Sequence, residues 1–263
     1  MSQGSERLHG LDAVRGYALL LGVAFHATMS FLPGPQIWLV GGTQRTPVLG
    51  AVFFTSHMFR MTTFFLIAGF FARMSLNQRG LRGFVKDRLK RIAVPLVVGW
   101  PILFGAILLA GGYAIYVATG AFPTRPPPSP PQPPGAFPLT HLWFLYVLLW
   151  FYAASLALRG LVHRLDRTGT FRATVDRVVG ALTRNRFGVL ALAAPTALAL
   201  GLLPGWMAWF GVPTPDSNLI PNPPAVVQFF LAFGFGWLLH RQIGLLDAWR
   251  RHAFLNLAVA VAP

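Results

Sequence analysis

The chain alternates between long apolar stretches and short segments that carry nearly all of its charge. A helix needs about 20 mostly apolar residues to cross the roughly 30 Å hydrocarbon layer of a bilayer. Six stretches meet or approach this length. They predict six transmembrane helices, near Leu11–Leu32, Val48–Phe71, Ala93–Ala118, His141–Leu158, Phe187–Trp206 and Ala225–Leu239.

A further apolar run, Ala253–Pro263, reaches the last residue of the chain. It predicts the start of a seventh transmembrane helix that the chain does not complete. The fold class expected from this pattern is an all-α polytopic membrane protein. We expect residues 1–263 to form a single transmembrane domain that is incomplete at its C-terminus.

The composition supports this fold class and excludes several kinds of chemistry. Hydrophobic residues make up 54% of the chain and charged residues only 11%, whereas a typical soluble domain is about 25% charged. The mean hydropathy is +0.56. There is no cysteine, which excludes disulfides, thiol nucleophiles and metal sites built on thiolates.

The basic residues are distributed unevenly between the two sides of the predicted domain. The chain has 22 Lys and Arg against seven Asp and Glu, for a formal net charge of +15. If the N-terminus is cytoplasmic, 18 of them lie inside, in the N-terminal tail and in residues 73–91, 159–186 and 241–252, and only Arg45 and Arg125 lie outside. Cytoplasmic loops carry such an excess of Lys and Arg. The pattern predicts a multi-pass protein with a cytoplasmic N-terminus, and it explains the charge without nucleic-acid binding.

Two of the connections have compositions that predict their structure. Residues 121–138 are dominated by proline, so we expect an extended, stiff spacer outside the membrane rather than a peptide-docking motif. Residues 159–186 place apolar residues among arginines, a pattern typical of an amphipathic helix on a membrane surface.

Ionisable side chains within membrane spans are costly and are therefore candidates for function. The candidates here are Arg15 and His26 in the first span, His57 and Arg60 in the second, and His141, which lies beside Trp143 where the fourth span begins.

Most of these residues also have a purely structural explanation. Arg15 can extend to the cytoplasmic interface, and His26 can form a hydrogen bond between helices. His57 can serve packing alone, and His141 with Trp143 can belong to an interfacial aromatic belt. These alternatives stay open.

The spacing of the candidates places several of them together. Arg15 and His26 are eleven residues apart, which at about 100° per residue puts them within roughly 20° of the same helix face. If the first span ends near Leu32 and the second begins near Ala51, His26 and His57 lie at about the same depth below the outer surface, and Arg60 lies one turn deeper. Arg60 is mid-span with no acidic residue in its helix. We expect His26, His57 and Arg60 to share one polar cavity.

Missing motifs narrow the chemistry further. Apart from Asp12, the predicted spans contain no carboxylate, which disfavours carboxylate proton relays and cation channels. The chain has no phosphate-binding loop motif, no HExxH motif and no cluster of ligands typical of a metal site. The remaining possibility is a basic cavity with a histidine, suited to an anionic substrate and to general-base or acyl-accepting chemistry.

Four segments resemble the acyltransferase 3 family of bacterial integral-membrane acyltransferases. The first is LDAVRG at 11–16, with ten residues between Arg15 and His26. FFLIAGFFAR at 64–73, RLKRIAVPL at 88–96 and HLWFLYVLL at 141–149 follow in the same order. Within the family, the resemblance is closest to the branch of the periplasmic-glucan succinyltransferases.

The resemblance implies a function and a site. Members take an acyl group from cytoplasmic acyl-CoA and deliver it to a hydroxyl of a carbohydrate or lipid-linked glycan at the outer face of the bacterial inner membrane. They usually form a bundle of about ten helices, so this chain would be a C-terminally truncated one. The donor would be acetyl-CoA or succinyl-CoA, and no metal is implied.

The resemblance and the polar residues together suggest a role for each candidate. The catalytic residues would be His26, as general base or acyl carrier, and Arg15. The phosphates of coenzyme A would be bound by Arg15, Arg88 and Arg91. His57 and Arg60 would orient His26 or stabilise an oxyanion, and His141 and Trp143 would line the acceptor entrance.

Two other functions remain possible from the sequence. A transporter or flippase for an anionic glycan or lipid would also need a basic cavity without carboxylates. A non-catalytic membrane partner would tolerate substitution of Arg15 and His26.

Overall fold

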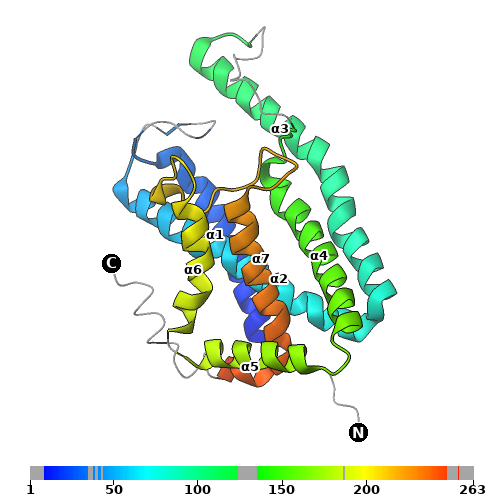
Figure 1. The fold of residues 1–263 in the computed structure, drawn as a ribbon. Helices are drawn as coiled ribbons and strands as arrows, with labels where there is room; N and C mark the ends of the chain where they lie inside the picture. Colours follow the sequence, from blue (N-terminus) through cyan, green and yellow to red (C-terminus); the bar gives the residue numbers. More distant parts are fainter. Residues whose placement is uncertain are drawn as a thin grey trace. The chain divides into compact units, whose positions relative to one another are not determined.

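The structure is a computed structural model that describes residues 9–34, 38, 41–42, 44–123, 135–185, 187–247 and 254. Within these residues the chain is helical, and one isolated bridge pairs Ala136 with Asn218. Figure 1 shows the described helices, which are α1 His9–Thr28, α2 Pro47–Arg88, α3 Val94–Thr119, α4 Trp143–Leu165, α5 Thr170–Arg184, α6 Gly188–Gly201 and α7 Pro223–Leu239. Short helical turns lie at Met29–Phe31, Leu89–Ala93, Thr140–Leu142, Ala208–Phe210 and His240–Leu245.

The all-helical apolar fold class predicted from the sequence is confirmed in the part of the chain that the structure describes. Three helical runs there are long and apolar enough to cross a membrane, namely Pro47–Thr119, Thr140–Leu165 and Pro223–Leu245. The count of six complete spans is not confirmed, because two further apolar helices, Gly16–Phe31 and Gly188–Gly201, are shorter. The predicted seventh helix at Ala253–Pro263 lies outside the described residues, except for Phe254.

The basic segment 73–91, expected to connect two spans, is itself helical. α2 continues through it to Arg88, and a π-helical turn at Leu89–Ala93 leads into α3. The chain bends at Gly80, where φ is 66° and ψ is 177°, a conformation that is readily adopted only by glycine. Long basic side chains favour helix, so the high charge of this segment does not interrupt α2.

Of the two connections whose structure was predicted, the structure describes the amphipathic one and little of the proline-rich one. Most of the predicted spacer 121–138 lies outside the described residues. The predicted amphipathic segment 159–186 contains the end of α4 and the whole of α5, a separate 15-residue helix. Val179 on α5 is buried, whereas Phe171 and Val178 are exposed.

The chain divides into two compact units, and the expected single domain over 1–263 stays a prediction. The first unit comprises Met1–Phe64, Val85–Leu149 and Met207–Asn222, and the second comprises Phe65–Phe84, Trp150–Trp206 and Pro223–Pro263.

The first unit is held together by stacked aromatic rings and by main-chain hydrogen bonds between two irregular segments. Phe25 of α1 stacks on Phe53 of α2, with ring centroids 4.7 Å apart. The amide of Phe137 donates to the Ser217 carbonyl at 3.0 Å, and the amide of Thr140 donates to the Asp216 carbonyl at the same distance. These bonds fix the backbone that leads into α4.

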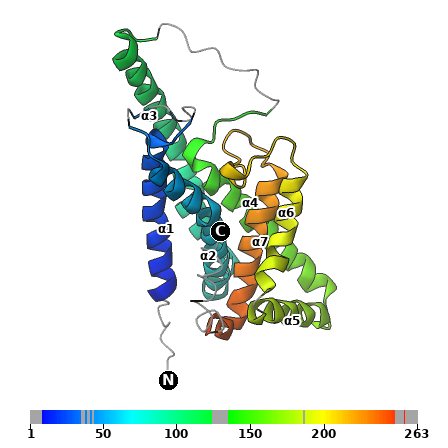
Figure 2. The same cartoon turned by 90° about the vertical axis from the view of Figure 1, so that its left-hand side faces the viewer.

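The second unit is a helical cluster in which α6 and α7 lie side by side (Figure 2). Their contact includes a hydrogen bond from the Thr196 hydroxyl to the side-chain oxygen of Gln228. The Phe65–Phe84 part of α2 approaches α7 so closely that a β-carbon at Gly69 would lie 1.9 Å from the Phe233 carbonyl oxygen. Glycine at this position therefore permits the packing of α2 against α7.

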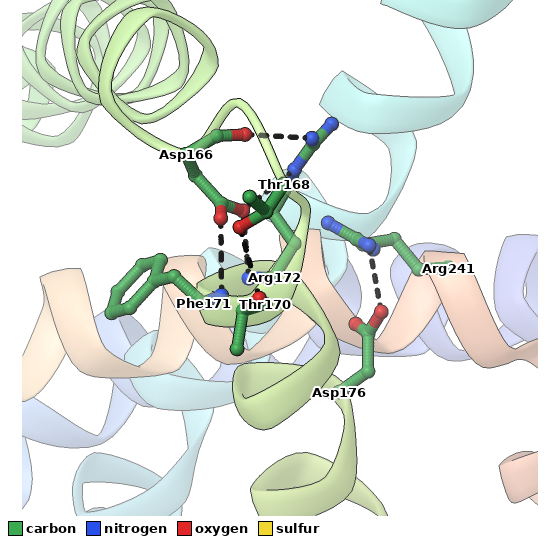
Figure 3. A network of polar contacts seen from close by, with 7 residues as sticks. All are labelled: Asp166, Thr168, Thr170, Phe171, Arg172, Asp176 and Arg241. Carbon is green, nitrogen blue, oxygen red and sulfur yellow. Dashed lines mark hydrogen bonds and ion pairs between the residues drawn. The ribbon is translucent and has the colours of Figure 1, made fainter.

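Asp166 terminates α4 and organises the start of α5 (Figure 3). Its carboxylate accepts hydrogen bonds from the amides of Phe171 and Arg172, at 3.1 and 3.0 Å. The guanidinium Nε of Arg172 donates to the same carboxylate at 2.9 Å. The first amides of a helix lack partners within the helix and carry a partial positive charge, so this carboxylate stabilises the reversal between the two helices.

Candidate active site

The first unit brings together four of the side chains singled out from the sequence. The group is built on His26, which lies half-buried in the last turn of α1. Its Nδ1 is 2.8 Å from the carbonyl oxygen of Gly22, one turn earlier. A carbonyl oxygen only accepts, so Nδ1 donates and the lone pair of the neutral ring is on Nε2. An imidazole held in this tautomer is prepared to accept a proton at Nε2.

A second imidazole and an indole surround the His26 ring. The ring centroid of His141 lies 4.8 Å from that of His26. The Trp38 ring lies 6.0 Å from His26 and 5.8 Å from His141. The three rings come from segments that are distant in sequence, and His141 is the exposed member.

The backbone immediately before His141 is unusual and is fixed by a contact with a distant segment. Thr140 has a φ of +50°, which is uncommon for a residue with a β-carbon. Its amide bonds the Asp216 carbonyl, and its hydroxyl is buried without a hydrogen-bond partner. Residues in such conformations persist where the surrounding structure holds them, often at functional sites.

Arg60 is a buried cation close to His26. Its side chain is 7% exposed, and its guanidinium carbon lies 4.2 Å from the ring centroid of Phe25. Its Nε is buried without a hydrogen-bond partner, and among the described residues no carboxylate pairs with it. A β-carbon at Gly22 would lie 3.0 Å from its Nη1, so Gly22 leaves room for the guanidinium beside α1.

His57 lies against the other aromatic rings of this cluster. Its Nε2 donates to the Phe210 carbonyl at 2.8 Å, which leaves the lone pair of the neutral ring on Nδ1. That nitrogen is buried and has no hydrogen-bond partner. The ring stacks on Phe25 and Phe53, with centroids 5.3 and 5.7 Å away.

Gly211 permits the approach of the 207–222 segment to His57. Its φ is +55°, and an added β-carbon would lie 3.1 Å from Cδ2 of His57. Both the backbone conformation and the available space therefore favour glycine here. Phe210 and Gly211 together set the orientation of the His57 ring.

Phe25 connects these groups. Its ring lies edge-on to His26 at 5.1 Å, stacks on His57 and contacts the guanidinium of Arg60. His26 is also within electrostatic range of His141, Arg60 and His57. The described part of the first unit thus forms a cluster of three imidazoles and one guanidinium, which we call the histidine cluster: His26, His57, Arg60 and His141.

The other predicted site residues lie outside the histidine cluster or are not described. Arg15 belongs to α1, but its side chain is outside the described residues. Arg91 pairs with Asp87 at 2.9 Å, and Arg88 lies 3.8 Å from the same carboxylate. Trp143 is buried, whereas His141 two residues before it is exposed.

Sequence reasoning missed several residues that build the cluster. Trp38 lies between the first two spans, in a segment whose composition gave no signal for contact with His26. Gly22 was detectable in principle, because a histidine can donate to the carbonyl four residues earlier in a helix. Phe25 and Gly211 act through tertiary contacts that no local pattern reveals.

The histidine cluster has the parts for proton transfer and for stabilising negative charge. Among the described residues, no group of three or more His, Asp or Glu is arranged to bind a metal ion. The uncompensated guanidinium of Arg60 would favour an anionic ligand or a developing oxyanion nearby.

Comparison with known proteins gives a family match over nearly the whole chain. The family described as an acyltransferase domain matches residues 8–262. Among curated proteins, the glucans biosynthesis protein C of Shigella dysenteriae serotype 1 (strain Sd197) and that of Escherichia coli (strain SMS-3-5 / SECEC) are each 33% identical over 101 residues. The protein of the same name from Escherichia coli O1:K1 / APEC is 32% identical over 101 residues.

These alignments cover only part of each protein. They span 38% of this chain and 25% of each relative, so the chain matches about a quarter of the length of the curated relatives. No solved structure matches the chain.

Proposed function

The chain belongs to the acyltransferase 3 family, as its sequence motifs predicted, and we propose that it is a membrane O-acyltransferase acting on a glycan. The group transferred is acetyl or succinyl, the donor is cytoplasmic acyl-CoA, and the acceptor is a hydroxyl of an extracytoplasmic carbohydrate or lipid-linked glycan. The name of the curated relatives, glucans biosynthesis protein C, supports a glucan as the acceptor.

His26 is the catalytic base in this proposal. The observation that carries it is the hydrogen bond from Nδ1 to the Gly22 carbonyl, which leaves Nε2 to take the proton of the acceptor hydroxyl. The hydroxyl oxygen then attacks the thioester carbon, and the carbon–sulfur bond breaks with release of the coenzyme A thiolate, which takes up a proton. An alternative course has Nε2 carry the acyl group between donor and acceptor.

Arg60 and His57, which contact the same Phe25 ring as His26, stabilise the reaction. A guanidinium buried without a carboxylate keeps its full charge for a developing oxyanion. His57, held by Phe210 and close to Gly211, orients the aromatic ring against which both Arg60 and His26 lie.

His141 and Trp143 form the acceptor side of the site. The exposed imidazole of His141 lies 4.8 Å from His26, which supports a role in guiding a sugar hydroxyl toward Nε2. Trp38 adds an aromatic surface next to both rings. Flat aromatic faces with polar neighbours suit the mixed apolar and polar faces of a sugar ring.

The donor phosphates are bound by Arg15, Arg88 and Arg91 in this proposal. Arginine binds phosphate through two parallel hydrogen bonds. The Arg91 side chain is 68% exposed and therefore accessible to an anion in solution. Its ion pair with Asp87 fixes its position, although the carboxylate offsets part of the positive charge of the guanidinium. The positive charge of these segments supports a cytoplasmic location for them, with the protein in the bacterial inner membrane.

Transfer of label tests the proposal directly. Membranes that contain the full chain or its His26→Ala variant receive labelled acetyl-CoA or succinyl-CoA, and mass spectrometry follows the label into outer-face glucans. His163→Ala, which removes an exposed histidine in the last turn of α4, is the matched control. We expect label with the unmodified chain and with the control, and none with His26→Ala.

Two results would contradict the proposal. Equal labelling by all three proteins would remove His26 from catalysis. A folded protein that transfers neither label, but moves an anionic glycan or lipid across the membrane, would establish the transporter function instead.

A further inference from the structure

Three arginines of the second unit converge where α2, α4 and α7 come together. Gly69 of α2 packs against the backbone of Phe233 on α7. One turn further along each helix, the guanidinium carbon of Arg73 lies 5.5 Å from the ring centroid of Trp237. The close approach of the two helices therefore brings Arg73 beside the start of the turn His240–Leu245.

Arg241 lies in that turn and is fixed by α5 (Figure 3). Its guanidinium bonds the Asp176 carboxylate at 2.6 Å, and Gln242 donates to the Asp176 main-chain carbonyl at 2.9 Å. The side chains of Arg241 and Asp176 are 26% and 29% exposed. The pair is therefore anchored to the protein and still accessible from solvent.

Arg159 of α4 is the third member. Tyr152 of α4 contacts Phe233 edge-on, with ring centroids 5.6 Å apart. Arg159 lies seven residues after Tyr152, two turns along the same helix face, and is exposed. Arg73 is within electrostatic range of Arg159, Arg241 and Asp176, which agrees with this placement.

The charges of this group do not balance. Among the described residues the group contains three arginines and one carboxylate, Asp176. One oxygen of that carboxylate bonds Arg241, and the other, Oδ1, is buried without a hydrogen-bond partner. The Nε of Arg73 is buried and has no hydrogen-bond partner. Buried polar groups are nearly always hydrogen-bonded, and like charges repel, so an anion that accepts from Arg73 would bind favourably here.

We propose that Arg73, Arg159 and Arg241 form a binding site for a phosphoryl group. Guanidinium groups bind phosphate oxygens in pairs of parallel hydrogen bonds, and three of them from separate helices can surround one tetrahedral anion. Asp176 limits the positive charge and holds Arg241 in position. The site does not depend on the role of His26, because it lies entirely in the second unit.

Two sources supply a phosphoryl group to this site, and they are separable by experiment. One is a soluble nucleotide phosphate, and the other is the headgroup of an anionic lipid. The full chain is placed in nanodiscs of phosphatidylcholine, and binding is measured for adenosine 3′,5′-bisphosphate and, separately, for short-chain phosphatidylglycerol. Saturable binding of the first probe that is weakened by Arg73→Gln and Arg159→Gln assigns the site to a nucleotide, because both variants keep the arginines proposed for the donor. Saturable binding of only the second probe, weakened by the same substitutions, assigns it to a lipid.

Substitution identifies the residues responsible. Arg73→Gln and Arg159→Gln are expected to weaken binding of the active probe at least tenfold. Arg82→Gln removes the same charge from an exposed position of α2 outside the three-arginine group, and it should change binding less than twofold. Arg159 is exposed, so its variant keeps the test valid if Arg73→Gln does not fold.

The proposal is overturned if the folded chain binds neither probe. It is also overturned if binding is unchanged in both variants, or if Arg82→Gln weakens it as much as they do. None of these results bears on acyl transfer by His26, which is measured separately.

Discussion

The carbonyl oxygen of Gly22 lies 2.8 Å from Nδ1 of His26, one turn later in α1. This bond decides which nitrogen of the imidazole is available to a substrate. It arises within one helix, so it does not need a partner from elsewhere in the chain. The remaining features of the histidine cluster are tertiary, and those at Arg60 and Gly211 lead to tests.

His26→Asn separates the structural from the chemical role of His26. The asparagine amide can donate to Gly22 from about the position of Nδ1, but it offers no base at the position of Nε2. General-base catalysis contributes about 10²- to 10⁴-fold to rates, and we expect a loss of this size in acyl transfer with an unchanged melting temperature. A variant that unfolds early would show instead that the histidine is mainly structural.

Arg60→Met tests whether the buried guanidinium serves function rather than stability. Removing a buried charge without a carboxylate partner should raise the melting temperature. Since 1 kcal/mol corresponds to roughly 2–4 °C in domains of 150–250 residues, a rise of that order is expected. Acyl transfer should fall by about 10²-fold if the charge stabilises an oxyanion. A less stable variant with full activity would contradict both parts of this prediction.

Gly211→Ala tests the support of His57. The positive φ of Gly211 and the 3.1 Å approach to Cδ2 of His57 both oppose a β-carbon, and a residue held in such a conformation costs about 1–3 kcal/mol. We expect a lower melting temperature and a slower transfer. Gly105→Ala in α3, where an added β-carbon meets nothing within 4 Å, is the control and should leave both unchanged or slightly raise stability. Equal effects of the two substitutions would argue against a specific role of Gly211.

Asp166 predicts a pH dependence of stability. Burial alone would raise its pKa, but hydrogen bonds from Arg172 and Phe171, together with the charge of Arg172, hold the pKa below its usual value. A carboxyl with a lowered pKa in the folded state stabilises that state above the unfolded pKa of about 3.9, and the contribution is lost as the pH falls through the folded pKa.

The measurement compares melting temperatures of the unmodified chain and Asp166→Asn from pH 7 to pH 2. The unmodified chain should melt higher at pH 7, and the difference should shrink below about pH 4. If the difference in melting temperature persisted at pH 2, the stabilisation by Asp166 would come from its packing and neutral hydrogen bonds and not from its negative charge.

The local pattern of the sequence predicted the class of fold and the first helix of the site. Apolar runs of sufficient length require helices in a bilayer, and α2, α3, α4 and α7 lie where such runs occur. The same argument overestimated the length of the helix after Phe187, because the predicted span ran to Trp206 and α6 ends at Gly201. Hydropathy does not detect the turn that follows.

By itself, the sequence determined the helical apolar character of the chain, its family and the position of His26 in α1, because these depend on residues close together along the chain. Tertiary structure alone decided that His141 and Trp38 lie beside His26 and that Gly211 supports His57. It also decided that Arg73, Arg159 and Arg241 meet. These contacts join segments up to 168 residues apart, and helix packing that depends on glycine, as at Gly69, brings them together without leaving a periodic signal in the sequence.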